Sequence, residues 1–349
     1  MRLILTFVFA MFMVSCVDQR NSPSTSGDDL ISVIKPVGIG DSASISIDVI
    51  ATNLDTPWEI TYGADGYLWI TEEGGKVVRV DPHSGQKKVV YTAPDYSEGH
   101  PSECCQLCFN PDIGKGTLGL ALHPDFMNQA NAFIYYVYSY NHGSDSLHQT
   151  RFKICRLAWD HAGEKVTSAT DLVKGLPSGF DHLGGRLLAV NRQGRNFLFL
   201  SIGDNGVSET NSPGCYDPDS LNPNYKCQDP GYMNGKIHRF NMDGTVPADN
   251  PLAGNSFYTR GHRNPQGLMY NPQQDVLYDI EHGDRSDDEI NILEKGMNYG
   301  WKYVRGYHND INYNGEDVFV GAYTPHPGIA NDKLVEPLYA WCAVTQHTS

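Results

Sequence analysis

The chain has 349 residues and a net charge of −15, from 26 basic and 41 acidic side chains. This charge argues against nucleic acid as a partner, because binding a phosphate backbone requires clustered lysine and arginine. Hydrophobic residues make up 40% of the chain, which is enough for a core, and the 35 glycines, 20 prolines and 20 tyrosines are typical of short strands joined by tight turns. The acidic balance slightly favours cations such as calcium as ligands.

The first 16 residues are predicted to form a lipoprotein-type signal peptide. Arg2 supplies a positive charge, and residues 3–14 form an apolar run that is too short to span a bilayer comfortably. The run leads to Cys16, in a sequence typical of a lipidated cysteine; an ordinary secretory signal with an incidental cysteine is the alternative. Residues 17–48 would then be a flexible tether and lead-in. We expect an exported, periplasmic protein of a bacterium, attached to the outer membrane only by its lipid anchor.

Seven of the eight cysteines follow Cys16, and an exported protein can form disulfides. Cys215 and Cys227 enclose a short loop rich in proline and asparagine, so we predict that they pair. The segment Cys104-Cys-Gln-Leu-Cys108 is interpreted as a disulfide-stapled loop. A metal or redox motif is the alternative, but no second CxxC follows and there is no Cys-His haem signature.

The first folded stretch predicts a meander of four short antiparallel strands, at residues 58–62, 67–72, 76–80 and 87–92. Turn sequences separate the strands, namely Gly63-Ala-Asp-Gly66, Glu73-Gly-Gly75 and Asp81-Pro-His-Ser-Gly85. Four strands within about 35 residues are the unit of a β-propeller blade.

The pattern then recurs with longer insertions. Further strands are expected at 117–124, 132–140, 150–159 and 171–176; at 186–190, 197–202, 235–241 and 256–260; and at 266–270, 276–280, 289–293 and 301–304. Such repetition favours an all-β propeller over a sandwich. A fifth set is expected to begin near Trp341. Because a closed propeller needs its first and last blades to meet, we expect residues 49–349 to be an incomplete propeller whose last blades are missing here.

A candidate general base stands at the mouth of the third set of strands. His182 comes just before one strand, and Asp204 ends the next strand in Ser201-Ile-Gly-Asp-Asn-Gly206. A carboxylate from a neighbouring strand fixes the tautomer of an imidazole and stabilises its protonated form. The alternative is a loop histidine bonded to a backbone carbonyl.

Two further polar stretches follow. Arg263 and Asn264 suit an anionic, planar ligand, because the guanidinium fork matches carboxylate and carbonyl oxygens; a turn in which Arg263 pairs with a surface acid is the alternative. Residues 281–291 offer oxygen ligands for a hard cation such as calcium. Their spacing is not that of an EF-hand, so a solvated acidic turn is the alternative there.

Eight motifs in order resemble the PQQ-dependent glucose/sorbosone dehydrogenase family, which comprises soluble glucose dehydrogenases and, closer to this chain, aldose sugar dehydrogenases. The motifs are Asn53-Leu-Asp-Thr-Pro57, Leu118-Gly-Leu-Ala-Leu-His-Pro-Asp-Phe126, Asp181-His-Leu-Gly-Gly-Arg186, Ile202-Gly-Asp204, Gly235-Lys-Ile-His-Arg-Phe-Asn241 with Asp243-Gly244, Gly261-His-Arg-Asn-Pro-Gln-Gly267, Asp287-Asp-Glu-Ile-Asn291 and Asn298-Tyr-Gly-Trp301. One motif alone is weak evidence, but eight in family order are specific.

The resemblance implies a six-bladed propeller that carries PQQ and calcium above its central channel and oxidises an aldose at the anomeric hydroxyl to the lactone. His182 would take the hydroxyl proton while hydride passes to PQQ, Asp204 would orient His182, and Arg263 would polarise the reacting carbonyl. The same match assigns cofactor contacts to Arg263, Asn264, His282 and, more weakly, Trp341. It assigns one calcium to the carbonyls of Gly283 and Asp284, and a second to Glu289 and the carbonyl of Tyr299.

The sequence departs from the family in places. Asp284 stands where the family usually has proline, which keeps a carbonyl ligand but changes the stiffness of the loop. The basic residues that bind the PQQ carboxylates belong to the family's C-terminal blades. The alternative function is a non-catalytic propeller that binds sugar or protein in a calcium-dependent way at the cell surface, as the similar domain of hedgehog-interacting proteins suggests. The pairing of His182 with Arg263 favours an enzyme, and no feature of the sequence indicates its electron acceptor.

Overall fold

Four sheets of four antiparallel strands make up the fold. The structure is a computed structural model that describes residues 48–97, 116–143, 150–178, 182–205, 223–284, 286–308 and 315–341. Those from Val49 onwards belong to one unit. The predicted signal peptide with Cys16, all but the end of the tether, the loop at 104–108 and the disulfide partner Cys215 lie outside the described residues and stay predictions.

The first sheet is a meander of β1 (Pro57–Tyr62), β2 (Leu68–Glu72), β3 (Lys76–Val80) and β4 (Lys87–Thr92). Its turns form where glycine permits a close approach. Gly75 has a φ of 70°, and a Cβ at this position would lie 2.8 Å from the Cβ of Ala93. Because these turn signals are local, the strand bounds agree with prediction to within one residue.

The second sheet contains β5 (Thr117–Leu122), β6 (Phe133–Asn141), β7 (Thr150–Asp160) and β8 (Lys165–Leu176), with the short 3-10 helix η2 (Gln129–Asn131) between β5 and β6. β8 begins before the expected residue 171. A tight turn after β7 returns the chain at once and pairs Asp160 with Lys165, so the hairpin extends beyond the segment that its composition predicts.

The third sheet contains β9 (Leu187–Arg192), β10 (Arg195–Ile202), β11 (Lys236–Asn241) and β12 (Phe257–Arg260), and the fourth contains β13 (Pro265–Asn271), β14 (Val276–Glu281), β15 (Asp288–Leu293) and β16 (Tyr339–Trp341). The expected strand at 301–304 is wrong, because those residues form turns. Its place is taken by β16, which pairs Trp341 with Asp288. Trp341 therefore ends the fourth sheet and does not begin a fifth.

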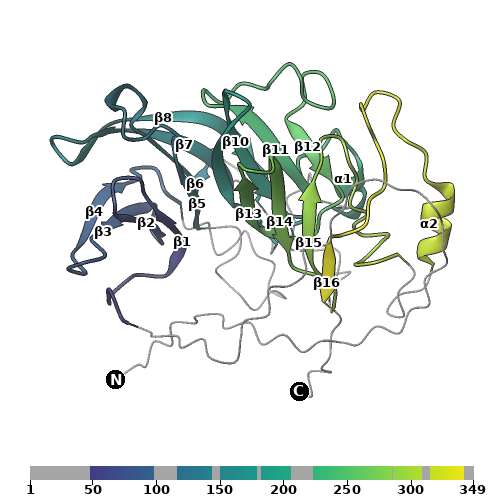
Figure 1. Cartoon of the computed structure of the whole chain (residues 1–349), viewed down its shortest axis with the longest axis horizontal. Coiled ribbons are helices and arrows are strands. Elements are labelled where there is room, and N and C mark those ends of the chain that lie inside the picture. The colour runs from purple at the N-terminus through teal and green to yellow at the C-terminus, as the bar shows by residue number, and fades with distance from the viewer. Residues whose placement is uncertain are drawn as a thin grey trace. The chain divides into compact units, whose positions relative to one another are not determined.

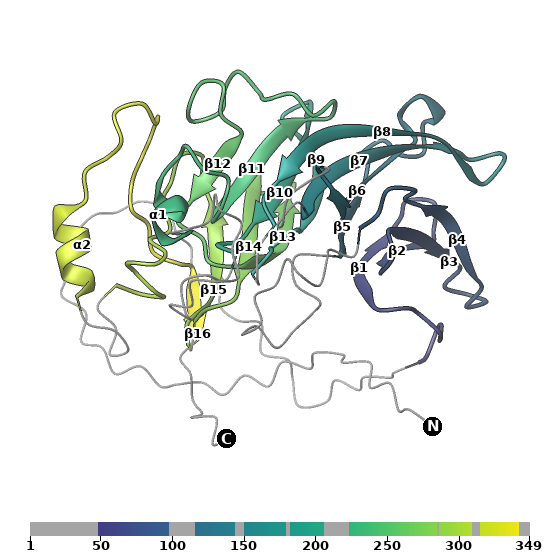
Figure 2. The ribbon, with the colours of Figure 1, turned by 180° about the vertical axis from the view of Figure 1, so that it is seen from behind.

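The sheets follow one another in chain order, with their first strands adjacent. β1 contacts β5, β5 contacts β9, and β9 contacts β13. Figures 1 and 2 show the four sheets fanned side by side from two opposite directions. Within each sheet the other strands follow in sequence from the first, which is the arrangement of propeller blades. The prediction of an all-β propeller with four-stranded blades is confirmed.

Helices occur only in connections within the described part of the chain. α1 (Pro223–Gln228) follows the third sheet's second strand, and α2 (Glu316–Ala322) lies in the excursion between β15 and β16. None of the described helices has the length and apolar character that a bilayer span requires.

Aromatic rings fill the space between the first two sheets. Trp69 on β2 is fully buried, and its ring centroid lies 5.6 Å from that of Phe126 and 5.0 Å from that of Trp159, both edge to face. Its Nε1–H donates to Asp65 Oδ1 at 3.2 Å, so the indole is both packed and satisfied.

Replacing Trp69 by alanine should lower the free energy of unfolding by about 3–5 kcal/mol, because it empties the space between Phe126 and Trp159. Urea unfolding followed by circular dichroism measures the change. Ile60→Ala is the control, since Ile60 is 61% exposed and its truncation should cost less than about 0.5 kcal/mol. Equal losses in the two variants would contradict the assigned core.

Candidate active site

Polar residues collect at one edge of the third and fourth sheets. His182 precedes β9 and Asp204 follows β10, while Arg263 and Asn264 precede β13 and His282 follows β14. Neighbouring antiparallel strands run in opposite directions, so the start of one and the end of the next lie at the same edge. The structure therefore brings five of the predicted site residues to a common edge.

The His182 imidazole is held by a buried carboxylate. Its Nδ1 lies 2.8 Å from Asp204 Oδ1, and Asp204 Oδ2 accepts a hydrogen bond of 2.9 Å from Trp301 Nε1. His182 is 8% exposed and Asp204 is fully buried. When Nδ1–H donates to Asp204, Nε2 is the acceptor nitrogen of the ring, which is the tautomer that a general base requires.

The loops that carry His182 and Arg263 meet at the end of β10. The Asp204 N–H donates to the Arg263 carbonyl at 2.7 Å, and the Asn205 N–H donates to the His182 carbonyl at 3.3 Å. A Cβ at Gly203 would lie 1.9 Å from the His182 carbonyl oxygen, so only glycine permits this approach. His182 and Arg263 are thus fixed relative to each other through the residues at 203–205.

Arg263 is buried beside an aromatic ring. Its guanidinium carbon lies 5.5 Å from the centroid of Trp301, and Nη1 donates to the His282 carbonyl at 3.0 Å. Asn264 joins the third sheet to the fourth, because its Oδ1 accepts from the Gly184 N–H at 3.1 Å and its carbonyl accepts from the His282 N–H at 3.2 Å. Asn264 therefore has a positioning role within the protein itself.

Trp301 is the residue of this group that sequence reasoning missed. Its Nε1–H binds Asp204, its ring lies beside Arg263, and the Arg305 guanidinium carbon lies 5.3 Å from the ring centroid. The motif Asn298-Tyr-Gly-Trp301 is the signal that could have identified it. The Trp301 indole thus contacts both Asp204, which holds the candidate base, and Arg263, which is expected to polarise the reacting carbonyl.

The residues predicted to hold the cofactor's calcium lie in a turn after β14. The exposed His282 ring has its Nδ1 2.8 Å from the Gly283 carbonyl oxygen, and the Asp284 carboxylate pairs with Arg305 at 3.0 Å. A Cβ at Gly283 would lie 1.9 Å from the Ser286 carbonyl oxygen, so the turn needs glycine to close. Backbone carbonyls of such a turn are suitable oxygen ligands for calcium.

The second predicted calcium pair, Glu289 and Tyr299, lies deeper in the protein. Glu289 Oε1 accepts from the Gly306 N–H at 2.8 Å, and Oε2 accepts from Asn291 Nδ2 at 3.0 Å. Burial, and then the neighbouring Glu281 carboxyl group, raise the pKa of Glu289 well above its usual value. A bound cation favours the charged form of a carboxyl group, so the Glu289 carboxylate suits calcium as a ligand.

Trp341 lies at the same edge of the fourth sheet as His282, because it ends β16 and pairs with Asp288 at the start of β15. Its ring contacts Tyr339 with centroids 4.7 Å apart, and its carbonyl accepts from the Asp287 N–H at 2.7 Å. Among the contacts of the described residues, none joins Trp341 to His182 or Arg263. Its predicted contact with the cofactor stays a prediction.

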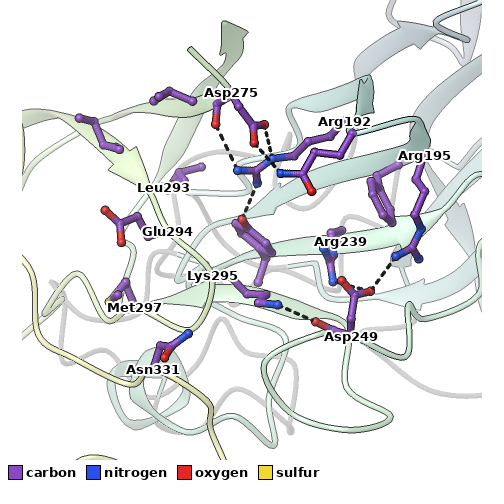
Figure 3. A pocket seen from close by; sticks show the side chains of 15 residues that line it. Arg192, Arg195, Arg239, Asp249, Asp275, Leu293, Glu294, Lys295, Met297 and Asn331 are labelled. Atoms are coloured by element: carbon purple, nitrogen blue, oxygen red, sulfur yellow. Dashed lines mark hydrogen bonds and ion pairs between the residues drawn. The ribbon is translucent and has the colours of Figure 1, made fainter. Parts of the chain in front are cut away.

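A pocket of about 490 Å³ opens at the opposite end of the third sheet, beside the β9–β10 hairpin (Figure 3). Its three arginines are paired with carboxylates, and Lys295 donates to the Asp249 carbonyl at 3.2 Å. Arg192 binds Asp275 at 2.6 Å, while Arg195 and Arg239 lie 3.5 and 3.1 Å from Asp249. Because these pairs offset its charge and no histidine lines it, we locate the candidate active site at the His182 edge instead.

Comparison with known proteins identifies the family of the chain. Residues 54–348 match the family model described as Glucose / Sorbosone dehydrogenase, and the chain therefore belongs to this family. It is 34% identical over 299 residues to quinoprotein glucose dehydrogenase B from Acinetobacter calcoaceticus, and the aligned region covers 82% of this chain and 56% of that protein. It is 30% identical over 283 residues to the aldose sugar dehydrogenase YliI from Escherichia coli, which covers 78% of this chain and 65% of that protein.

A solved structure is similar in fold. The PQQ-bound aldose sugar dehydrogenase from Streptomyces coelicolor superposes with a TM-score of 0.60 at 25% sequence identity, over 85% of this chain and 71% of that one. The family resemblance seen in the sequence is confirmed. The matched region nevertheless spans only 56% and 65% of the two curated relatives.

Replacing Gly203 by alanine should lower the free energy of unfolding by about 1–3 kcal/mol, because the added methyl group crowds the His182 carbonyl. Gly321→Ala is the matched control. Gly321 lies in α2, and nothing is within 4 Å of a Cβ built there, so its replacement should leave stability unchanged or slightly higher. Urea unfolding of both variants tests the close approach, which a neutral Gly203→Ala variant would contradict.

Proposed function

We propose that this chain is part of a PQQ- and calcium-dependent dehydrogenase that oxidises an aldose at its anomeric hydroxyl to the lactone. The observation that carries the proposal is the linkage of His182, Asp204, Trp301 and Arg263 at one edge of the propeller. Membership in the Glucose / Sorbosone dehydrogenase family supports the same class of reaction.

His182 would act as the general base. Its Nδ1–H faces Asp204, so Nε2 is the atom that would accept the proton of the anomeric hydroxyl. The buried Asp204 carboxylate stabilises the imidazolium that forms, and the Trp301 indole N–H keeps the carboxylate in place. Loss of the hydroxyl proton and of the hydride from the anomeric carbon leaves the lactone carbonyl, a two-electron oxidation.

The residues present suit a planar, anionic cofactor. PQQ, when bound, supplies the two-electron acceptor for the hydride. Arg263 is 4% exposed and is anchored through one guanidinium nitrogen to the His282 carbonyl, which orients its charge along this edge. A guanidinium held in this way can bind and polarise a carbonyl oxygen. Asn264 and His282 complete the same rim, and Trp341 is proposed as a further contact.

Calcium would occupy two places in this proposal. The carbonyls of Gly283 and Asp284 would hold the ion next to the cofactor, in the turn that Gly283 allows to close. Glu289 and the Tyr299 carbonyl would hold a second, structural ion. The raised pKa of Glu289 supports this second assignment, since a carboxyl group buried beside another carboxyl group gains a partner when a cation binds.

A dye-linked assay with PQQ, calcium and a panel of aldoses tests the activity. His182→Gln should reduce the rate of dye reduction about 10²–10⁴-fold, because proton transfer from the hydroxyl loses its acceptor, while equilibrium binding of PQQ persists. His83→Gln, on the exposed turn between β3 and β4, is the matched control and should be fully active.

Two outcomes would overturn the proposal. One is the absence of aldose-dependent dye reduction in the wild-type protein despite bound PQQ, which would favour the binding propeller. The other is equal activity in His182→Gln and the wild type, which would remove the assigned base.

We also propose export and lipid anchoring through Cys16, on the basis of the signal-like sequence at residues 1–16. In bacteria grown with labelled palmitate, the wild-type protein should take up label and sediment with outer membranes. Cys16→Ser should do neither. An unlabelled wild-type protein would show that the cysteine is incidental.

A further inference from the structure

Three buried ionisable side chains lie close together at the fourth sheet, two from β14 and one from the segment before β13. A ring nitrogen of His262 and one carboxylate oxygen each of Asp279 and Glu281 lie within 4.8 Å of one another. His262 and Asp279 are fully buried, and Glu281 is 4% exposed. None of the three belongs to the candidate active site or to the calcium pairs described above.

The sheet register explains why these acids share one face. Alternate residues of a strand point to the same side, so Asp279 and Glu281 of β14 project together. Asn291 and Glu289 of β15 stand opposite them in the pairing, and all four are buried. One face of β14 and β15 therefore carries three carboxyl groups and an amide where a blade usually carries apolar side chains.

His262 is held with its Nδ1 toward the two carboxyl groups of β14. Nδ1 lies 3.1 Å from Glu281 Oε2 and 3.5 Å from Asp279 Oδ2. Nε2 lies 2.8 Å from Thr259 Oγ1, and the ring stacks on Tyr299 with centroids 4.7 Å apart. The Thr259 hydroxyl on Nε2 and the stacked Tyr299 ring together fix the orientation of Nδ1. Metal-binding histidines are commonly oriented by such a contact to the nitrogen that does not bind the metal.

Several acceptors of the cluster lack a hydrogen-bond donor, although His262 Nδ1 is within hydrogen-bond distance of Glu281 Oε2. Neither carboxylate oxygen of Asp279 accepts a hydrogen bond of standard geometry, and neither does Oδ1 of Asn291, although all three atoms are buried. Buried acceptors are normally satisfied, and buried charges are paired or bind metals.

We propose that His262 Nδ1, Asp279 and Glu281 bind one divalent transition-metal ion, such as Zn²⁺ or Mn²⁺, inside the fourth blade. Asn291, opposite Asp279, is the candidate for a fourth ligand. An imidazole nitrogen with carboxylate oxygens suits these ions, whereas calcium takes oxygen ligands. Ligand atoms on one ion are about 3–4 Å apart, so the observed spread of 4.8 Å closes with small side-chain shifts. The proposal does not depend on the enzymatic activity.

Metal titration of the purified chain tests the site. After treatment with a chelator, the protein is titrated with Zn²⁺ in millimolar Ca²⁺, which fills the oxygen-only sites, and binding is followed by calorimetry and thermal unfolding. Co²⁺ replaces Zn²⁺ in a parallel titration, because its visible absorption reports nitrogen ligation. We expect one equivalent to bind and the midpoint of unfolding to rise.

Matched variants identify the ligands. Asp279→Asn keeps the shape of the side chain and should weaken binding at least about tenfold, and His262→Gln should abolish the cobalt absorption. The two variants are independent tests if one of them fails to fold. Asp243→Asn, on an exposed turn, should keep one equivalent of Zn²⁺.

Two outcomes would overturn the proposal. They are no binding by the wild-type protein at micromolar Zn²⁺, or unchanged affinity in the folded Asp279→Asn variant. Because the readout is metal binding, these outcomes are distinct from failure of the dehydrogenase assay.

Discussion

The structure of the candidate active site depends on how the buried Asp204 carboxylate is satisfied. A carboxylate with no access to water must be given hydrogen-bond donors, or its burial is strongly unfavourable. Here the donors come from far apart in the sequence: His182 precedes β9, and Trp301 lies between β15 and β16. Satisfying one charge therefore sets the orientation of the imidazole and ties two blades together. Glycine at position 203 allows the backbone to approach closely enough for this.

A second group of buried carboxyl groups, around Asp279, is not satisfied by hydrogen-bond donors in this way. Asp204 has a donor on each oxygen, whereas Asp279 has none that meets standard geometry. In the proposed function, the first arrangement would stabilise the positive charge that proton abstraction places on the His182 ring. In our proposal, a bound cation completes the second arrangement. The same side-chain chemistry thus supports a proton acceptor in one blade and, in our proposal, a metal ion in the next.

The sequence predicts most strands because their signals are local. Glycine-rich turns and short apolar runs predict the strands of the first three sheets. The pairing of His182 with Asp204 is predicted because loops at the same edge of a sheet lie close together. β16 could not be predicted in this way. Three residues become a strand there because β15 offers an unpaired edge, after an excursion that contains α2. Pairing across such a distance leaves no local signature.

The parts of the site that sequence reasoning missed share this origin. Trp301 reads as a strand residue, and its bond to Asp204 spans 97 positions. The buried cluster was hidden because His262 stands beside Arg263 in a motif that points to ligand binding, and because an acid such as Asp279 is expected to face solvent. Alternation along β14 was the available clue, since Leu277, Asp279 and Glu281 fall on one buried face.

The most direct test of the central claim is a crystal structure of this chain with PQQ and calcium. The account predicts one cofactor molecule at the edge formed by β9, β10 and β13, within about 3.5 Å of side-chain atoms of both His182 and Arg263. A cofactor bound in the pocket beside Arg192, or touching only one of the two residues, would contradict it.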